Sequence, residues 1–394
     1  MLFTAFVSCN ENSNDSKTGF TDVKEIVSPA ADSCAEPFLF TDANGLVYLS
    51  WIEKKNGEAT LKFSTLSGNE WTAPVTIASG NDWFVNWADY PVIAADGNGN
   101  MIAHYLQKSD TGKFTYDVKY VMSANKGATW STSKVLNEDG KEAEHGFVSI
   151  STYGENYFLS WLDGRNAAPI KGAGHEGHHG EMTLRGAVLK KDGTKESEWE
   201  LDNKVCDCCQ TSSAITNNGP VVVYRDRSDE EIRDMSIVRL INGSWTTPKT
   251  IFADNWKIAG CPVNGPRVAA IGNNLAITWF SMKDNTGTVK IIFSEDGGAT
   301  FNTPIQINEG NSIGRVAVVM LNNSTAAVCW MEGSEIKLTK VNADGTKETS
   351  VLIASSSDAR SSGFPQMTRN ANRLIFAWTD SKAKTIKLSG MDLK

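Results

Sequence analysis

Residues 267–301 read RVAAIGNNLAITWFSMKDNTGTVKIIFSEDGGATF. A first apolar run ends at Ile271, a turn follows at Gly272, and a second run leads from Leu275 to the aromatic Trp279. Short apolar runs bounded by glycine and asparagine are typical of antiparallel β-strands joined by tight turns. A third run precedes the polar, glycine-rich segment 294–301, which indicates another turn before a further strand. The stretch therefore predicts one small antiparallel sheet.

The same arrangement recurs along the chain at intervals of about 40 to 60 residues, a period typical of propellers and other repeat folds. Its most regular part is the second strand, which ends in tryptophan or tyrosine each time. The seven copies are Val47-Tyr-Leu-Ser-Trp51, Met101-Ile-Ala-His-Tyr105, Tyr157-Phe-Leu-Ser-Trp161, Val221-Val-Val-Tyr224, Leu275-Ala-Ile-Thr-Trp279, Ala326-Ala-Val-Cys-Trp330 and Leu374-Ile-Phe-Ala-Trp378. We therefore expect an all-β fold, a single seven-bladed β-propeller over residues 19–394.

The last repeat lacks a strand that the first residues of the chain can supply. The other repeats continue into a fourth strand, often written Trp-Thr-x-Pro-x-x-Ile, as in Trp71-Thr-Ala-Pro-Val-Thr-Ile77. After Thr385-Ile-Lys-Leu-Ser389 the sequence ends at Lys394, whereas Thr21-Asp-Val-Lys-Glu-Ile-Val27 has the character of a fourth strand without a blade of its own. We expect the two to share one blade, which closes the ring and removes exposed strand edges.

Two linkers between third and fourth strands carry a recognisable motif. Ser294-Glu-Asp-Gly-Gly-Ala-Thr-Phe301 and its degenerate copy Ser123-Ala-Asn-Lys-Gly-Ala-Thr-Trp130 resemble the Asp-box, or BNR repeat, of sialidase-like propellers. In that motif the aspartate and glycines form a tight turn and the aromatic residue plugs the blade. The resemblance implies a sialidase-like fold over nearly the whole chain. The motif itself indicates a structural turn on the face opposite the active centre.

The N-terminal residues resemble a bacterial lipoprotein signal. Met1-Leu-Phe-Thr-Ala-Phe-Val-Ser precedes Cys9, and a polar stretch follows up to Lys17. The resemblance implies cleavage before Cys9, a lipid on that cysteine, and a polar tether, so residues 1–18 are expected to lie outside the propeller. The expected location is the cell envelope, with the protein anchored to the outer membrane and facing the periplasm or the cell surface.

Charge and composition exclude some partners. The net charge is -8 and no run of lysine or arginine occurs, so nothing favours binding to nucleic acid or to an anionic membrane surface. Membrane contact is therefore expected through the lipid anchor only.

Four of the seven cysteines are expected near one place. Cys206, Cys208 and Cys209 lie in the connection that leads into the innermost strand of the fourth blade, and Cys261 lies in the corresponding connection of the fifth. In a propeller these connections share one face with the loops between second and third strands, at the mouth of the central channel. The long third-blade loop on that face carries His175, His178 and His179.

Thiolates and imidazoles that converge suit copper or zinc, because soft sulfur and borderline nitrogen ligands hold these ions against water. We expect copper, with zinc as the second choice, in metal handling or in support of a redox reaction. Cys206, Cys208 and Cys209 are too close in sequence for all three to reach one ion from an extended backbone. Two of them with Cys261 or a histidine are the expected ligands, and a site with several Cu(I) ions is a further alternative.

Disulfides are the competing interpretation of the same cysteines. In an oxidising compartment one bond can link Cys261 to the cluster and another can join Cys208 to Cys209, and then no metal cofactor is expected. Cys329, beside Trp330 in an interior strand, is expected to be a buried apolar residue.

The resemblance to sialidases implies an exo-glycosidase acting on acidic glycans. In that family three arginines bind the substrate carboxylate, a Tyr paired with a Glu attacks, and an Asp acts as acid and base. The residues available for these roles at the mouth are Asp89, Tyr90, Glu144, Asp163, Arg225, Arg227, Arg315 and Arg360. The chain departs from the family in having seven predicted blades instead of six and in lacking its early Arg-Ile-Pro motif. Arg165, Arg225 and Arg227 can equally brace neighbouring loops through salt bridges.

A third interpretation needs no catalytic residue. A lipid-anchored propeller can serve as an accessory subunit of an outer-membrane protein complex, with its broad faces as docking surfaces. Trp83, Phe84 and Trp87 are candidates for such a surface or for a sugar platform, and alternatively they pack between blades.

Overall fold

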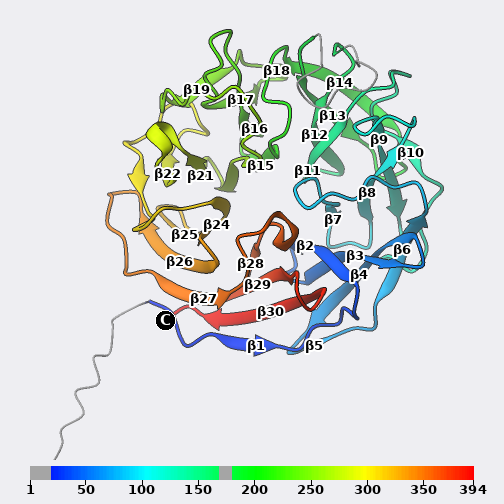
Figure 1. Cartoon of the computed structure of the whole chain (residues 1–394), viewed down its shortest axis with the longest axis horizontal. Coiled ribbons are helices and arrows are strands. Elements are labelled where there is room, and N and C mark those ends of the chain that lie inside the picture. The colour runs from blue at the N-terminus through cyan, green and yellow to red at the C-terminus, as the bar shows by residue number, and fades with distance from the viewer. Residues whose placement is uncertain (1–18, 168–179) are drawn as a thin grey trace, which may run out of the picture.

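The computed structural model describes residues 19–167 and 180–394, which form seven antiparallel sheets arranged as blades around a central axis (Figure 1). The first blade contains β2 (Cys34–Thr41), β3 (Val47–Lys55), β4 (Glu58–Ser67), β5 (Glu70–Trp71) and β6 (Val75–Gly80). The second contains β7 (Ile93–Ala95), β8 (Met101–Lys108), β9 (Tyr116–Ser123) and β10 (Lys134–Val135). The third contains β11 (His145–Tyr153), β12 (Asn156–Asp163), β13 (Thr183–Leu189) and β14 (Lys195–Asp202). The prediction of a seven-bladed all-β propeller is confirmed.

The remaining four blades follow the same order from the axis outward. The fourth blade contains β15 (Ser212–Thr216), β16 (Gly219–Arg225), β17 (Met235–Ile241), β18 (Ser244–Trp245) and β19 (Lys249–Phe252), and the fifth contains β20 (Arg267–Ile271), β21 (Asn274–Ser281), β22 (Thr288–Ser294) and β23 (Ile305–Gln306). The sixth contains β24 (Gly314–Asn322), β25 (Thr325–Glu332), β26 (Glu335–Asn342) and β27 (Val351–Ser355). The seventh contains β28 (Gln366–Asn370), β29 (Arg373–Asp380), β30 (Thr385–Asp392) and β1 (Lys24–Ile26). In residues 19–167 and 180–394, two short 3₁₀ turns, η2 (Lys283–Asn285) and η3 (Arg360–Ser362), lie in loops. Across the described part of the chain, no helix has the length and apolar character needed to cross a bilayer.

The ring closes through strands from the two ends of the sequence, as predicted. β1 pairs antiparallel with β30, with Lys24 opposite Gly390 and Ile26 opposite Leu388. Figure 1 shows β1 on the outer edge of the blade that holds β28, β29 and β30. Because a fourth strand is supplied from the other end of the chain, β30 does not present a free edge.

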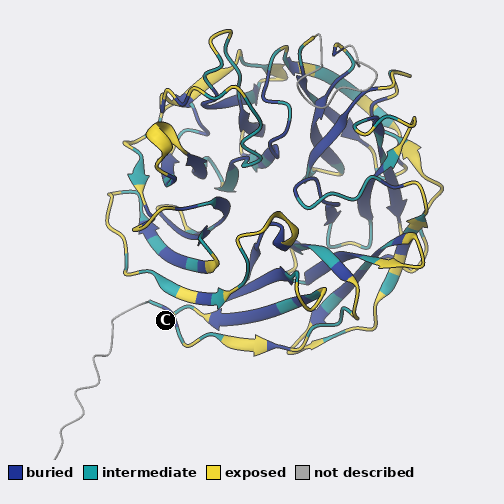
Figure 2. Ribbon diagram, viewed as in Figure 1, coloured by how far each residue is buried: buried dark blue, intermediate teal, exposed yellow. Residues whose placement is uncertain are grey.

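Hydrophobic packing between blades holds the ring together. The second-strand tryptophans Trp51, Trp161, Trp279 and Trp330 are at most 1% exposed. Several of their indole N–H groups donate to carboxylates, as Trp161 does to Asp163 at 2.8 Å, which satisfies the polar atom of an otherwise apolar side chain. Figure 2 shows these inner strands buried and the outer strands more exposed.

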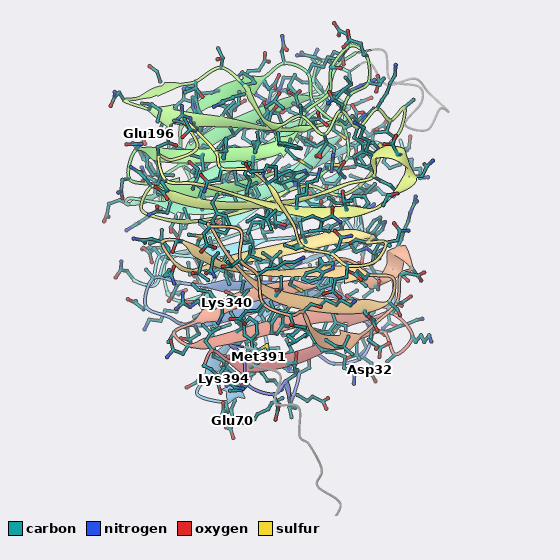
Figure 3. The ribbon with its side chains drawn as sticks, turned by 90° about the vertical axis from the view of Figure 1, so that its left-hand side faces the viewer. Asp32, Glu70, Glu196, Lys340, Met391 and Lys394 are labelled. Atoms are coloured by element: carbon teal, nitrogen blue, oxygen red, sulfur yellow. The ribbon has the colours of Figure 1, made fainter. Side chains whose placement is uncertain are left out.

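Side chains of the closing blade also pack against those of the neighbouring blade. Met391 of β30 packs in one cluster with Ile336 and Leu338 of β26. The side view in Figure 3 shows Met391 in the layer next to Lys340 of that strand. The blade completed by β1 is therefore joined to its neighbour by apolar contact as well as to its own strands by hydrogen bonds.

The Asp-box turn forms as its sequence predicts. Asp296 accepts hydrogen bonds from the Thr300 N–H at 2.8 Å and the Thr300 hydroxyl at 2.7 Å, and the Ser294 hydroxyl accepts from the Gly298 N–H at 2.8 Å. Gly298 has φ +88°, a conformation that favours glycine. In the degenerate copy the Asn125 side chain accepts from the Thr129 N–H at 2.9 Å, so asparagine substitutes for aspartate in the same turn.

Several innermost strands have a β-bulge near their first residues. The strand register shifts between Ala35 and Phe38, between Gly146 and Ser149, and between Gly314 and Ala317. Each bulge contains a residue with positive φ that is not glycine, namely Glu36, Phe147 or Arg315. Such bulges redirect side chains, and the strained backbone persists only where surrounding contacts hold it.

Candidate metal site and the cavity beside it

A turn in the connection between β14 and β15 brings three thiols together. The Cys206 N–H donates to the carbonyl of Arg225 at 3.1 Å, and the chain then turns at residues 207 and 208. As a result the sulfurs of Cys206, Cys208 and Cys209 all lie within 4.8 Å of one another, with 3.7 Å between Cys206 and Cys209. The three sulfurs converge because the backbone turns here and is not extended, while the ligand set of two cysteines with Cys261 or a histidine stays a prediction.

Nitrogen donors surround the sulfur atoms. Arg233 Nη1 donates to the Cys206 sulfur at 3.2 Å, and the N–H of Asn264 donates to the Cys209 sulfur at 3.4 Å. Glu231 fixes the other end of the Arg233 guanidinium by accepting from its Nη2 at 2.8 Å. Hydrogen bonds of this kind favour the charged thiolate over the neutral thiol.

The three thiols differ in their acidity. Burial raises the pKa of Cys206 to about 11, although Arg233 acts in the opposite direction. Burial and the neighbouring thiols raise the pKa of Cys208 well above its usual range. Burial also opposes ionisation of Cys209, but hydrogen bonds from the Cys206 and Cys208 thiols, together with Arg225, lower its pKa well below that range. Cys209 is therefore the thiol that ionises most readily.

Cys261 extends the cluster toward an open cavity. Its thiol interacts with that of Cys208, and the two line a cavity of about 470 Å³. Cys208 is 4% exposed, whereas Cys261 is partly exposed. All six cysteines in the described residues are free thiols, so no disulfide links them here. The predicted ligands His175, His178 and His179 and the predicted anchor Cys9 lie outside the described residues.

A buried carboxyl group, that of Glu144, lines the same cavity, and a second, that of Asp89, lies nearby. Tyr116 donates to Glu144 at 2.8 Å and also interacts with Asp89, which accepts from the Phe147 N–H at 2.7 Å. Burial raises the pKa of Asp89 to about 7, and burial together with Asp89 raises the pKa of Glu144 well above its usual range. The tyrosine paired with Glu144 is thus Tyr116, while Tyr90 contacts Arg267.

Most of the arginines singled out in the sequence are engaged by the protein itself. Arg225 is 1% exposed and donates to the carbonyls of Arg233, Asn264 and Phe280 at 2.7 to 2.8 Å. Arg315 donates to the Ser362 hydroxyl at 2.7 Å and to the Gly363 carbonyl at 2.9 Å, and Arg227 donates to Glu231 at 2.7 Å. Arg360 is exposed and lines the cavity.

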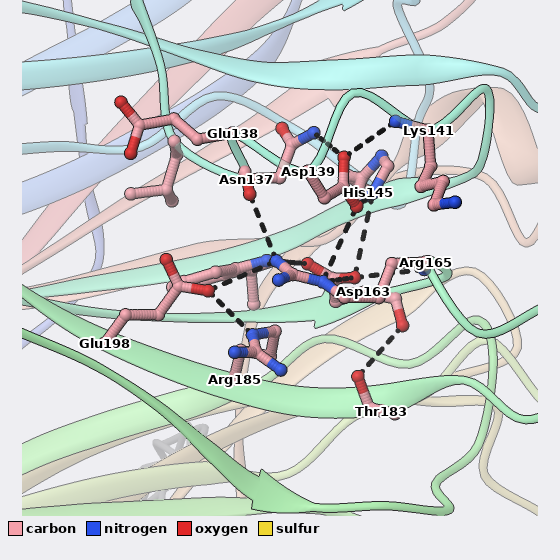
Figure 4. A network of polar contacts seen from close by, with 12 residues as sticks. Asn137, Glu138, Asp139, Lys141, His145, Asp163, Arg165, Thr183, Arg185 and Glu198 are labelled. Carbon is pink, nitrogen blue, oxygen red and sulfur yellow. Dashed lines mark hydrogen bonds and ion pairs between the residues drawn. The ribbon is translucent and has the colours of Figure 1, made fainter.

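Asp163 belongs to a separate network that braces two blades (Figure 4). Arg165 Nη2 donates to Asp163 at 2.7 Å and to the Asn137 carbonyl of the neighbouring blade at 3.1 Å. His145 Nε2 lies 2.8 Å from Asp139, and the pKa of His145 is raised because Asp139 and Asp163 outweigh the effect of burial. Asp139, His145 and Asp163 have a spacing that fits a metal ion, but the Arg165 guanidinium supplies the positive charge.

Comparison with known proteins identifies the family. The BNR repeat-like domain profile matches residues 53–375, which is most of the chain.

The chain belongs to the BNR repeat-like domain family.

The fold is shared with two solved structures at low sequence identity, the first two of those that follow. The polysaccharide lyase Uly1 is 8% identical with a TM-score of 0.54, and the alignment covers 91% of this chain and 90% of that one. The phage phi92 endosialidase is 10% identical with a TM-score of 0.50, covering 95% and 69%. The Hadza microbial sialidase Hz136 is 13% identical with a TM-score of 0.44, covering 76% of this chain and 63% of that one. No curated protein matches in sequence.

Two residues of this BNR repeat-like protein contribute to the site without having been found from its sequence, and a third, Arg267, lines a separate pocket. Arg233 contacts Cys206, Tyr116 contacts Glu144, and Arg267 contacts Tyr90. Arg267 is the first residue of an innermost strand, and Arg315 lies at nearly the same position of its own repeat. Arg267 could therefore have been predicted from its position in the repeat. Arg233 and Tyr116 lie at the start of third strands, where sequence gives no sign of which way a side chain points.

Proposed function

We propose that this protein binds Cu(I) as a cargo at the buried cluster of Cys206, Cys208 and Cys209, with Cys261 beside it. The observation that carries the proposal is the convergence of three buried, unbridged thiols at one point. Cu(I) is favoured over harder cations because thiolate ligands are soft, and zinc remains the second choice.

The spacing of the sulfurs supports a metal-binding role. Thiolates held at about 2.3 Å from a tetrahedral ion lie about 3.8 Å from one another. The distance between the Cys206 and Cys209 sulfurs is 3.7 Å, far longer than a disulfide bond and close to that value. The third sulfur lies within 4.8 Å of both, so small side-chain rotations suffice to bring it into the same shell.

The charges around the cluster also support this role. Binding a single positive ion to three thiolates leaves a net negative charge, which is costly in a buried site unless it is compensated. Arg233 donates to the Cys206 sulfur, and Arg225 lies close enough to Cys209 to favour its thiolate. These two buried cations suit a thiolate complex of a monovalent metal.

Anaerobic titration with Cu(I) in competition with a chromophoric Cu(I) chelator tests the proposal. We expect the untagged protein to remove one equivalent of Cu(I) from the chelator and the double variant Cys206→Ser/Cys209→Ser to remove none. Cys34→Ser is the matched control, because Cys34 lies outside the cluster and its sulfur donates only to the Asp32 carbonyl, as a hydroxyl can. A wild-type protein with free thiols that leaves all Cu(I) on the chelator refutes the proposal.

Glycan processing is a second candidate, favoured by the pairing of Tyr116 with Glu144 on the floor of a cavity that also contains Arg360. Against it, the guanidinium groups of Arg225 and Arg315 donate to the protein's own groups. Hydrolysis of a fluorogenic sialoside by the wild-type protein, lost in Glu144→Gln and retained in Cys206→Ser/Cys209→Ser, would establish this activity. If the protein binds the metal but releases no product from sialosides, the cargo function stands and the glycosidase function is refuted.

The proposed location follows from the N-terminal sequence. We expect attachment to the outer membrane through Cys9, and neither a protein complex nor a glycan partner is required for metal binding. Fractionation of cells that express the wild-type protein or Cys9→Ser tests the anchor. Release of the variant into the soluble periplasmic fraction is the expected result.

A further inference from the structure

The three cysteines of the cluster and the neighbouring Cys261 differ in their access to solvent: two are sealed from the cavity and two line it. Cys206 and Cys209 are 0% and 1% exposed, and N–H donors from Arg233 and Asn264 contact their sulfurs. Cys208 and Cys261 line the cavity of about 470 Å³, and Cys261 is the only one of the four that is not classed as buried. A ligand arriving from solvent therefore reaches Cys261 first.

The cavity has the size and lining of a small-molecule site. Sites for small ligands are typically about 300 to 1,000 Å³ and combine apolar walls with a few polar groups. Phe84 stacks on Tyr116 with ring centroids 4.1 Å apart, and Trp87 stacks on Phe364 at 5.7 Å. Phe114 completes the aromatic wall. Because these stacked rings hold one another in place, the cavity is part of the folded structure.

Positive charge at the edge of the cavity favours an anionic ligand. Lys113 and Arg360 are both exposed and both line the cavity, and the Lys113 ammonium lies 5.1 Å from the centre of the Phe114 ring. The acidic residue of the cavity, Glu144, is 3% exposed and bonded to Tyr116 on the floor. An approaching molecule thus meets the cations before it meets the carboxyl group.

We infer that Cu(I) enters and leaves the site through this cavity, carried by a small thiol that bears carboxylates, and that Cys261 is the first residue to bind it. This inference rests on the proposed function. In the exchange, a Cu–S bond to Cys261 forms and a Cu–S bond to the carrier breaks. The carrier leaves with the proton that Cys261 gives up, and no electron is transferred. In the next exchange a Cu–S bond to Cys208 forms, the bond to Cys261 breaks and the Cys208 proton passes to Cys261, which brings the ion beside Cys206 and Cys209.

Alkylation of the metal-free protein tests the order of access without any metal. Time-resolved iodoacetamide labelling followed by peptide mass spectrometry should modify Cys261 first, Cys208 next, and Cys206 and Cys209 at least about tenfold more slowly, since reaction depends on access as well as on thiolate content. Cys329, which is 0% exposed, is the internal standard for a sealed thiol. Labelling of Cys206 or Cys209 as fast as Cys261 overturns the route.

Stopped-flow loading tests the carrier. Cu(I) is offered either as its glutathione complex, which is anionic, or as a complex with the neutral thiol dithiothreitol. Cys261→Ser should slow loading from both by about tenfold while weakening equilibrium affinity less, because the pathway is blocked before the final site is reached. Lys113→Gln and Arg360→Gln should each slow loading from the glutathione complex about threefold and leave dithiothreitol loading unaffected.

The outcomes separate the two proposals. If the wild-type protein takes no Cu(I) at equilibrium, the proposed function fails. If it binds Cu(I) tightly and Cys261→Ser loads at the wild-type rate, only the route through the cavity is wrong. If the charge variants change loading from both carriers equally, the carrier is not selected by its negative charge. Circular dichroism of each variant excludes unfolding as the cause.

Discussion

Arg233 donates a hydrogen bond to the sulfur of Cys206 across 3.2 Å, which places a buried guanidinium in contact with the thiol cluster. Hydrogen bonds to a charged acceptor contribute about 1.5 to 3 kcal/mol. Arg233→Gln should therefore lower the affinity for Cu(I) by about tenfold or more, as measured by chelator competition. Arg239→Gln is the control, because Arg239 lies in β17, the strand that follows Arg233, and its backbone N–H donates to Thr246. Equal affinities in the two variants would show that Arg233 does not stabilise the bound state.

The brace formed by Arg165 should contribute more to stability than a neighbouring ion pair. Asp163 is 0% exposed, so Arg165→Met leaves a buried charge without its main partner and should lower the free energy of unfolding by about 3 kcal/mol. Arg185→Met removes a partner of Glu198 and Glu200, of which Glu200 is substantially exposed, and should cost about 1 kcal/mol. Urea denaturation of the two variants measures the difference. The prediction fails if Arg185→Met is the more damaging change.

His104 should make the fold less stable in mild acid. Burial lowers the pKa of His104 to about 3, whereas an unfolded chain takes up the proton near its ordinary pKa of about 6.5. The stability that depends on neutral His104 is therefore complete above pH 6.5 and is lost as the pH falls toward 3, at up to about 1.4 kcal/mol per pH unit.

Comparison of the wild-type protein with His104→Gln isolates this effect. Between pH 7 and pH 5 the wild-type protein should lose up to about 2 kcal/mol more stability than the variant, as measured by urea denaturation. Asp89 and Glu36, whose pKa values burial raises to about 7, shift stability in the opposite direction but do so in both proteins. Parallel pH profiles for the two proteins would contradict the prediction.

Closure of the ring should depend on Ile26. Its side chain is 7% exposed and packs with Leu388 in the core beside the first blade, so Ile26→Ala should cost about 2 to 3 kcal/mol. The next residue, Val27, is 87% exposed, and Val27→Ala should change stability by less than about 0.5 kcal/mol. Thermal unfolding of both variants provides the measurement. A larger loss for Val27→Ala would mean that β1 contributes nothing through burial.

The blades and their closure were predictable because their signals are local. Each second strand repeats an apolar run ending in an aromatic residue, and the missing fourth strand matched the character of residues 21–27. Position within the repeat also predicted that the region of Cys206 would meet Cys261.

The finer geometry of the site depends on contacts that sequence does not display. The turn at residues 207 and 208 allows all three thiols to converge, and it is stabilised by long-range contacts such as the bond from Cys206 to Arg225. The orientation of Arg225 toward carbonyl groups and of Tyr116 toward Glu144 follows from packing between blades. For Arg165 the sequence left two interpretations open, and the hydrogen bond to Asp163, two residues away, agrees with the brace.

The pairing of β1 with β30 fixes the order in which the molecule can be completed. Because Lys24 pairs with Gly390, β1 finds its partner only after the more than 300 residues between the two strands have been synthesised. Pairings between such distant segments form slowly, because the chain loses much conformational freedom before the contact forms. Nascent chains and fragments truncated before residue 388 therefore leave the last blade incomplete and expose strands that can join other chains.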